Sequence, residues 1–252
     1  MPVPIAAEPL WREPAAQRRA IEAAWAEFAA AGLADRGGLD SDAAVMLDVL
    51  THPHAEYVAV VLTAAGIAGS VVASRGHDVI VAVRQSDDVT LAGMRGVSLP
   101  DTLIRQIPDA TPAPIEPVNI RASDVPAADE LAGFDTGLPD GLQAISDQAS
   151  ASGLHSGGWG DGRSAAQRDA DTIARLRGLP VLGQGEMHIT LRDAYGRQRR
   201  SDPIRYQDYP IGRVVVANGQ GFLSIAPASK TQLRDRLVAA HRRLDDAQRI
   251  PE

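Results

Sequence analysis

The chain has no cysteine among its 252 residues. A protein without thiols cannot form disulfides, and it cannot build iron–sulfur clusters, thiolate zinc sites or cysteine-nucleophile active sites. Lysine is almost absent as well, because Lys230 stands alone and arginine supplies the other basic side chains. Lys230 lies beside a predicted helix cap, where we expect a solvated surface residue rather than a Schiff-base catalyst.

Aromatic residues make up only 4% of the chain, so the core has to consist mainly of Ala, Val, Leu and Ile. No hydrophobic run approaches the roughly 18 residues that identify a transmembrane helix. Met1–Glu8 has neither the basic region nor the long apolar region of a signal peptide. We therefore expect a cytoplasmic protein that does not insert into a membrane.

Positive charge is in deficit, with 25 basic residues against 32 acidic ones and a formal net charge of −7. Nucleic-acid-binding domains usually carry a basic excess that neutralises phosphates, so we expect no nucleic-acid partner. The hydrophobic content of 44% and the charged content of 23% are typical of a folded globular protein.

Motifs that would indicate catalysis are missing. No G-x-S-x-G elbow of a serine hydrolase occurs. Gly157-Gly-Trp-Gly-Asp-Gly162 is rich in glycine, but it has neither the preceding strand nor the Gly-Lys-Ser/Thr ending of a phosphate loop. His52-Pro-His54 offers two metal ligands without a third, which favours an exposed turn over a zinc site. The sequence thus predicts no catalytic residue, no metal and no cofactor, and it favours a binding protein over an enzyme.

Local patterns predict both helices and strands. Helical spacing of apolar residues and N-capping residues indicate a helix over about Pro14–Ala31, a short one after Asp40, and others starting at Ser98, Ser164 and Ser229. Valine-rich runs between short polar turns predict the strands Glu56–Ala65, Ser70–Ser74, Asp78–Arg84, Asp87–Leu91, Val118–Arg121, Glu186–Ala194, Pro203–Asp208, Arg213–Ala217 and Phe222–Ile225.

Turn signals complete this picture. Asn218-Gly219 is a strong hairpin turn signal between the last two predicted strands. Arg197-Gln-Arg-Arg200 lies in a predicted turn, as either a solvated cluster or a contact for an acidic partner. Residues 124–132 and 138–149 are candidates for short helices, and residues 150–162 for a glycine-rich loop.

The two halves of the chain have the same order of predicted elements, namely a helix, strands, a valine-rich hairpin and a capped helix. This order predicts an α+β fold with a quasi-two-fold repeat, in which a central, mostly antiparallel sheet is flanked by helices on one side. We expect residues 1–122 to form the N-terminal half-repeat and residues 123–252 the C-terminal half-repeat, packed intimately as one unit.

Three sequence blocks resemble the EspG family, the ESX (type VII) secretion-associated chaperones. The first includes Leu33-Ala-Asp-Arg-Gly-Gly-Leu-Asp-Ser-Asp42, and the second is Arg75-Gly-His-Asp-Val-Ile-Val-Ala-Val-Arg84 with the following Val89-Thr-Leu91. The third and strongest runs from Gly183 through Gly212-Arg-Val-Val-Val216 to the closing helix. The resemblance covers about residues 15–107 and 160–245, and it depends on the order and spacing of the blocks.

The resemblance implies a function as well as a fold. Members of the family are cytosolic specificity chaperones that bind the apolar tip of PPE in PE–PPE heterodimers, keep the pair soluble and direct it to its ESX system. An exposed apolar tip promotes aggregation, and burying it removes that hazard. The resemblance therefore implies a PE–PPE heterodimer as partner, no enzymatic activity and no cofactor. We add a weak homodimer as a second association.

We expect the partner-binding surface in the C-terminal half, where the helix from Ser229 and the neighbouring sheet face would form an apolar concavity rimmed by the glycine-rich loop. The candidate partner-binding residues are Trp159, Gly157, Gly160, Leu233, Leu237, Arg213 and Asp208. Structural roles remain open for each of them. Trp159 is an interface anchor or a plug in its own core, Leu233 and Leu237 are interface or core residues, and Arg213 and Asp208 also suit fixing the sheet.

Two other functions remain as alternatives. A diverged, non-catalytic family member with a regulatory or self-associating role is the first. A small-molecule enzyme that uses a cleft between the two halves is the second, and a cleft without converging polar groups would count against it.

Overall fold

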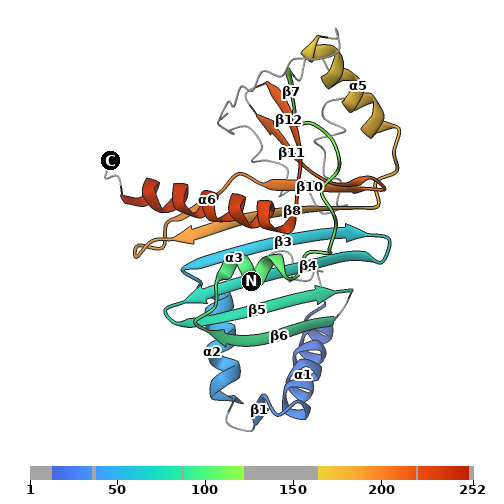
Figure 1. Ribbon diagram of the computed structural model, residues 1–252. Helices are drawn as coiled ribbons and strands as arrows, with labels where there is room; N and C mark the ends of the chain where they lie inside the picture. The colour runs from blue at the N-terminus through green and yellow to red at the C-terminus, as the bar shows by residue number, and fades with distance from the viewer. Residues whose placement is uncertain (1–12, 36–37, 87, 122–163, 220, 250–252) are drawn as a thin grey trace.

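The computed structural model describes residues 13–35, 38–86, 88–121, 164–219 and 221–249 (Figure 1). Its helices are α1 (Pro14–Ala30), α2 (Ser41–Thr51), α3 (Leu99–Ile104), α5 (Ala165–Arg177) and α6 (Lys230–Arg249). The strands are β1 (Ala34–Asp35), β2 (Gly38–Leu39), β3 (Ala55–Thr63), β4 (Gly66–Arg75), β5 (Asp78–Gln85), β6 (Asp88–Arg95), β7 (Val118–Arg121), β8 (Gly183–Arg192), β9 (Gln198–Arg200), β10 (Ile204–Tyr209), β11 (Gly212–Gly219) and β12 (Phe222–Pro227).

One ten-stranded sheet organises the described residues, in the order β6-β5-β4-β3-β8-β10-β11-β12-β7, with β9 paired to β8. Every ladder in it is antiparallel. The N-terminal and C-terminal strands meet at the β3–β8 ladder, where Tyr57 lies opposite Ile189 and Ala59 opposite Met187. The fold is therefore α+β with a large antiparallel sheet, as the sequence predicted.

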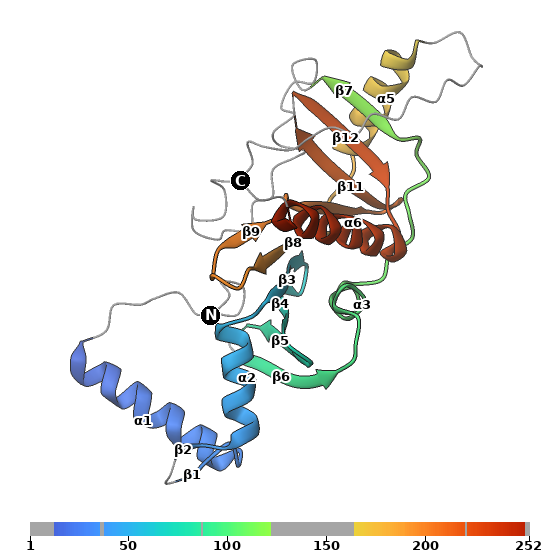
Figure 2. The same ribbon diagram turned by 90° about the vertical axis from the view of Figure 1, so that its left-hand side faces the viewer.

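Helices cover both faces of this sheet, which corrects the prediction of helices on one side only (Figure 2). Alternate residues of the same strands contact different helices. Tyr57 and Val72 belong to the core beneath α3 and α6, whereas their neighbours Val58 and Val71 belong to the core that contains Val49 and Leu50 of α2. α5 packs through Ile173 and Leu176 against the face of β11 opposite α6.

The physical reason lies in the strand sequences. β3 and β4 are apolar at consecutive positions, from Tyr57 to Val61 and from Val71 to Ala73, and all these residues are buried. A strand that is apolar on both sides has to be covered on both faces. Valine-rich runs of this kind indicate strands buried on both faces. The apolar stripes of the helices do not tell which face each helix covers.

The predicted helix starts are confirmed. The Asp40 carboxylate accepts a hydrogen bond from the backbone N–H of Asp42, and Ser98 caps α3 through the N–H of Asp101. Ser164 with Gln167 and Ser229 with Gln232 form the two expected capping boxes at α5 and α6. These contacts join residues two or three positions apart, so the local sequence is sufficient to specify them.

The predicted turn at Asn218-Gly219 is wrong. β11 continues through Gly219, which lies opposite Phe222 of β12. This register places Val216 opposite Ile225, and both side chains are buried in the core beneath α5. Register in a buried strand pair follows the shared apolar face, which here outweighs the local turn preference of Asn-Gly.

Other segments also differ from the expected strands: β4 begins at Gly66 rather than at Ser70, and β8 at Gly183 rather than at Glu186. β6 extends to Arg95, beyond the expected end at Leu91, and β9 forms within the segment expected to be a turn. In both cases a neighbouring strand supplies the backbone partner that the sequence does not reveal, namely β5 for β6 and β8 for β9.

The connection between the halves crosses the sheet beside β11. The backbone N–H of Arg213 donates to the carbonyl of Thr111, and the N–H of Ala113 donates to the carbonyl of Arg213. Gly212 has a φ of +126°, and a Cβ atom there would lie 2.7 Å from the backbone of Thr111 and Ala113. Only glycine permits this close crossing, which leads to β7 and its pairing with β12.

The two halves contain their main elements in the same order. α2, the β3–β6 meander and α3 come first, and α5, the strands β8 to β12 and α6 follow. β7 falls within the expected N-terminal half but pairs with the C-terminal strand β12. The internal repeat and the division at residue 122 stay predictions.

Candidate functional site

Arg213 and Asp208, two of the candidate residues, form a buried ion pair on the α6 side of the sheet. Nε of Arg213 donates to Oδ1 of Asp208 at 2.6 Å, and Nη2 donates to Oδ2 at 2.8 Å and to the carbonyl of Pro108 at 2.9 Å. The guanidinium also lies 4.2 Å from the centre of the Tyr206 ring. Arg213 has no exposed surface, so it serves the sheet and the crossing segment rather than touching a partner.

Tyr206 is fully buried beside this pair, and its ring lies directly over Gly185 of β8. A Cβ atom on Gly185 would come within 2.2 Å of the ring, so any side chain there would displace Tyr206. The burial of Tyr206 raises the pKa of its hydroxyl. Gly185 therefore makes room for the aromatic ring against which Arg213 packs.

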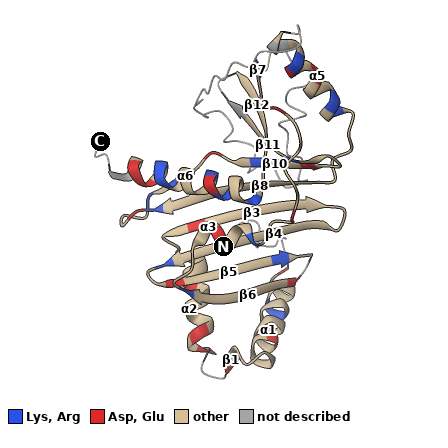
Figure 3. Cartoon of the chain, in the orientation of Figure 1, with Lys and Arg blue, Asp and Glu red and all other residues tan. Residues whose placement is uncertain are grey.

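Leu233 and Leu237 of α6 are fully buried in the core that both halves share. They hold α6 on the sheet, together with a hydrogen bond of 2.8 Å between the Tyr57 hydroxyl and Nδ1 of His241. The outer face of α6 carries charged residues of both signs (Figure 3). The described part of α6 therefore shows a polar face to the surroundings rather than the expected apolar concavity.

The remaining candidate residues, Gly157, Trp159 and Gly160, lie outside the described residues. So do the expected short helices within residues 124–149. Their contribution to the partner-binding surface stays a prediction.

An exposed apolar patch lies at the end of the sheet where β3 turns into β4 and β8 begins. We call it the hairpin patch and define it as Leu62, Ile67, Val181 and Leu182. Leu62 lies opposite Ile67 in the ladder, and Ile67, Val181 and Leu182 are 43%, 48% and 55% exposed. The backbone N–H of Leu182 donates to the carbonyl of Asp208 at 2.8 Å. The backbone of Asp208, whose side chain pairs with Arg213, therefore holds the start of β8 next to Leu182.

The sequence reasoning missed the hairpin patch. Val181 and Leu182 follow Pro180 in a segment that carries no strand or helix signal, and that was the available hint. Whether such residues are buried depends on the end of β3, which is more than a hundred positions away in the chain. The patch was therefore not visible from local patterns.

α1 carries a second exposed apolar stripe. None of its described residues is buried, and Ile21 and Trp25 are 51% and 45% exposed. Figure 2 shows α1 projecting away from the sheet beyond β1 and β2. The spacing of Ile21 and Trp25 is helical, as the sequence predicts for this segment, but α1 does not pack this stripe on the sheet.

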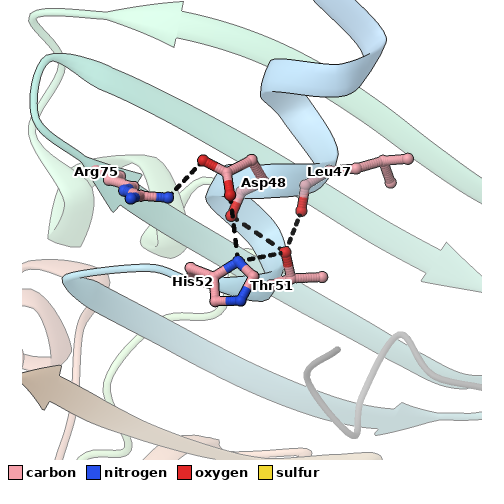
Figure 4. A network of polar contacts seen from close by, with 5 residues as sticks. All are labelled: Leu47, Asp48, Thr51, His52 and Arg75. Atoms are coloured by element: carbon pink, nitrogen blue, oxygen red, sulfur yellow. Dashed lines mark hydrogen bonds and ion pairs between the residues drawn. The ribbon is translucent and has the colours of Figure 1, made fainter. Parts of the chain in front are cut away.

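His52 belongs to a polar network at the end of α2 (Figure 4). Its Nδ1 lies 3.2 Å from Oδ1 of Asp48 and 3.0 Å from Oγ1 of Thr51, and Arg75 of β4 forms an ion pair with Asp48. This network ties the end of α2 to the sheet, which accounts for His52 without a metal. Among the described residues, no group of three or more His, Asp and Glu side chains is placed to hold a metal ion.

Of the basic cluster after Tyr195, Arg197 lies at the tip connecting β8 and β9, and Arg199 and Arg200 belong to β9. Asp193 accepts hydrogen bonds from the backbone N–H groups of Tyr195 and Arg197 and from Nε of Arg197, which fixes the turn. Tyr195 is 86% exposed, and the Arg197 guanidinium lies 5.7 Å from its ring. The tip is thus a rigid, solvated feature.

His188 is a buried polar residue on the α2 side of the sheet, where it lies opposite Val58 of β3. His188 of β8 is 7% exposed and accepts a hydrogen bond of 3.0 Å from Arg200 of β9. Burial, together with the Arg200 charge, lowers the pKa of His188 to about 3, so the imidazole is neutral at ordinary pH. Burial raises the pKa of the nearby Glu56, and Arg192 partly offsets this effect. Fixed in these bonds, His188 suits a structural role.

Comparison with known proteins identifies the chain. The model of the EspG family matches residues 1–239. The chain belongs to the EspG family. Among solved structures, the fold is similar to that of the Mycobacterium tuberculosis type VII secretion system chaperone EspG5, determined in complex with a PE25–PPE41 dimer. That match has a TM-score of 0.56 and 19% sequence identity, and it covers 85% of this chain and 82% of the other.

No curated protein sequence matches the chain. The EspG family is a family of type VII secretion chaperones, so the resemblance read from the three sequence blocks is confirmed. In the part of the chain that the structure describes, no helix has the length and apolar content needed to span a bilayer. The fold match extends across the β3–β8 junction, since it covers most of both chains.

Proposed function

We propose that this EspG family member is a cytosolic specificity chaperone of type VII secretion. It binds a PE–PPE heterodimer through the apolar tip of PPE, keeps the pair soluble and directs it to its ESX system. The observation that carries the proposal is the family match over residues 1–239. The similarity of the fold to EspG5, a protein solved together with a PE–PPE dimer, supports it.

The physical logic of such a chaperone is the burial of an apolar surface that would otherwise aggregate. Its partner surface therefore has to offer exposed apolar side chains on a rigid support. The hairpin patch has both properties, because Ile67 and Leu182 are about half exposed, Ile67 lies in the β3–β4 ladder, and the backbone N–H of Leu182 is held by the carbonyl of Asp208. An apolar centre with polar surroundings is the usual composition of such interfaces.

We place the hairpin patch at the PPE contact, together with the predicted loop residues Gly157, Trp159 and Gly160. Arg213 and Asp208 then act by positioning the start of β8, and Leu233 and Leu237 by holding α6. This arrangement needs neither a cofactor nor a metal. It gives Arg213, Asp208, Leu233 and Leu237 roles that agree with their burial.

Co-expression with PE–PPE pairs from the same genome tests the function. We expect an equimolar complex of the three chains in size exclusion with light scattering, and we expect it to be lost when the tip of PPE is truncated. If no pair co-purifies with the chaperone and all remain insoluble, the proposal is wrong.

The location of the contact is tested separately with Leu182→Asp. A buried, unpaired carboxylate in an apolar contact costs several kcal/mol, so we expect the affinity for PE–PPE to fall at least about tenfold. Val45→Asp is the matched control, because Val45 is also exposed, at 46%, but lies on α2 away from the patch. Equal losses in the two variants would argue against the hairpin patch, and Trp159→Ala then tests the loop alone.

A further inference from the structure

The turn that joins β8 to β9 concentrates positive charge in an acidic protein. Residues 192–200 contain four arginines and one aspartate, whereas the whole chain has a formal net charge of −7. Arg197 and Arg199 are exposed, and Tyr195 is 86% exposed. We call these three residues, Tyr195, Arg197 and Arg199, the basic tip. The proposed PE–PPE contact does not use them.

The backbone of the basic tip is fixed by Asp193. Its carboxylate accepts hydrogen bonds from the backbone N–H groups of Tyr195 and Arg197, at 2.8 and 2.9 Å, and from Nε of Arg197 at 2.6 Å. The backbone N–H of Asp193 donates to the carbonyl of Arg197 at 3.0 Å. Gly196 supplies the left-handed residue of the turn, with a φ of +79°. A turn held in this way loses little freedom when a partner binds, which lowers the cost of a contact.

The side chains of the basic tip are of the kinds that dominate protein interfaces. The Arg197 guanidinium lies 5.7 Å from the centre of the Tyr195 ring, so the ring holds this cation in place. Arg199 lies opposite Leu191 in the β8–β9 ladder, and no acidic side chain among the described residues forms an ion pair with it. Tyrosine and arginine are both enriched among the residues that contribute most to binding.

The basic tip and the hairpin patch lie at opposite ends of β8. The ten residues from Gly183 to Arg192 span about 30 Å in a strand. Figure 1 shows the β8–β9 turn and the β3–β4 turn on opposite sides of the sheet. A partner bound at the hairpin patch therefore leaves the basic tip accessible, and both surfaces can be occupied at the same time.

We propose that the basic tip is a docking site for a short acidic peptide segment of a second protein. The planar guanidinium group of arginine presents paired N–H donors that match a carboxylate. Arg199 binds a carboxylate of the peptide, while Tyr195 contacts its backbone and aliphatic atoms. The contact goes beyond the proposed function and does not depend on it, because no residue of the hairpin patch takes part.

The charge of the whole molecule favours a peptide over a larger polyanion. Nucleic acids and anionic membranes present charge over an extended surface, which repels a protein with a net charge of −7. Polybasic membrane sites also contain about 4–8 lysines or arginines. A short acidic peptide interacts with the basic tip alone, because charges beyond the Debye length of about 8–10 Å are screened.

Fluorescence anisotropy of a labelled hexaglutamate peptide, titrated with the full-length protein, tests the docking site. We expect saturable binding that Arg199→Glu weakens at least about fivefold in dissociation constant, because the reversed charge repels the peptide. Arg175→Glu is the matched control, since it makes the same charge reversal at an exposed arginine of α5. A labelled hexaglutamine peptide is expected not to bind.

Asp193→Ala distinguishes a built site from a surface that is merely basic. It removes a negative charge beside the arginines, so a purely electrostatic surface would bind hexaglutamate more tightly. It also removes the three hydrogen bonds that fix the turn, and we expect weaker binding for this reason. Tyr195→Ala is expected to weaken binding as well, whereas Tyr195→Phe keeps the ring and is expected to retain it. Circular dichroism verifies that each variant is folded.

Binding that is unchanged in Arg199→Glu, or stronger in Asp193→Ala, overturns the proposal. So does binding of phosphatidylserine vesicles or of polyuridine RNA that depends on Arg199 and that hexaglutamate does not displace, since the basic tip would then serve a phosphate-bearing polyanion. Loss of PE–PPE binding in a protein that still binds hexaglutamate through the basic tip would count only against the proposed function.

Discussion

Arg213 contacts three parts of the molecule: the segment from Thr111 to Ala113, the neighbouring strand β10 and the ring of Tyr206. Its side chain binds Asp208 and Pro108, and its backbone carbonyl accepts bonds from Ala113 and Ala228. The buried Nη1 atom of Arg213 has no partner within the described residues. A buried cation of this kind is stable only because Asp208 pairs with it in two-pronged geometry.

Arg213→Ala is expected to destabilise the protein by about 3–5 kcal/mol, because it leaves the carboxylate of Asp208 without its partner in a largely buried site. The double variant Arg213→Leu with Asp208→Leu is expected to lose less, since it removes both charges. Urea unfolding followed by circular dichroism measures both free energies. A single variant no less stable than the double variant would contradict the ion-pair role.

His188 gives the molecule a specific pH dependence. Its pKa in the folded state is about 3, below the usual value of 6.5, so the unfolded chain binds a proton between these values and the folded chain does not. Stability contributed by neutral His188 is complete above the unfolded pKa and is lost as pH falls toward the folded one. The slope of this loss approaches about 1.4 kcal/mol per pH unit.

His188→Gln removes this titration and keeps an oxygen that accepts the hydrogen bond of Arg200. We expect the variant to lose less stability than the native chain between pH 6 and pH 4, in urea unfolding at each pH. Identical slopes would show that the imidazole is not held neutral in the folded state.

At the scale of elements, the apolar stripe of α6 predicts a helix but does not predict what the helix packs against. Leu233, Leu237, Ala240 and Leu244 follow the spacing of an apolar helical stripe, and the capping box at Ser229 sets the start of the helix. Spacing does not tell whether a stripe packs on the chain itself or on a partner. The same ambiguity applies to α1, whose stripe of similar spacing is largely exposed.

Leu237→Ala is expected to cost about 2–5 kcal/mol of stability, because it opens a cavity in the core shared by both halves. Val238→Ala is the matched control on the same helix, since Val238 is only partly buried, and we expect a loss of less than about 1 kcal/mol. Thermal or urea unfolding measures the difference. A small effect of Leu237→Ala with lost PE–PPE binding would instead make Leu237 an interface residue.

On the scale of the whole molecule, the β3–β8 ladder and the core beneath α6 connect the two halves. Tyr57, Val72 and Leu103 from the first half share that core with Met187 and Leu237 from the second. An unpaired β3 would also expose a central apolar strand. The chain is therefore expected to fold as one cooperative unit.

Residues 1–107 expressed alone are expected to remain without fixed tertiary structure, because β3 loses its partner β8 and the core loses α6. Amide dispersion in an NMR spectrum, or near-ultraviolet circular dichroism, measures this against the full chain. A well-dispersed spectrum of the isolated segment would contradict the single cooperative unit.

The sequence by itself determined the local features of this protein. Capping boxes, most strands and the extent of the helices follow from interactions between residues a few positions apart, and the order of three blocks was sufficient to indicate the family. The absence of cysteine alone excluded whole classes of chemistry, because no fold can supply a thiol that the chain lacks. Arg213 and Asp208 also came from the sequence as candidates, through the resemblance to the family, whereas their pairing came from the structure.

Only the tertiary structure decided which surfaces are free. The hairpin patch brings together residues that are remote in the chain. The register of β11 against β12 overrode an Asn-Gly turn signal, since the buried valines had to share a face. Burial is a property of the whole fold, because a side chain is covered by whatever distant segment packs against it.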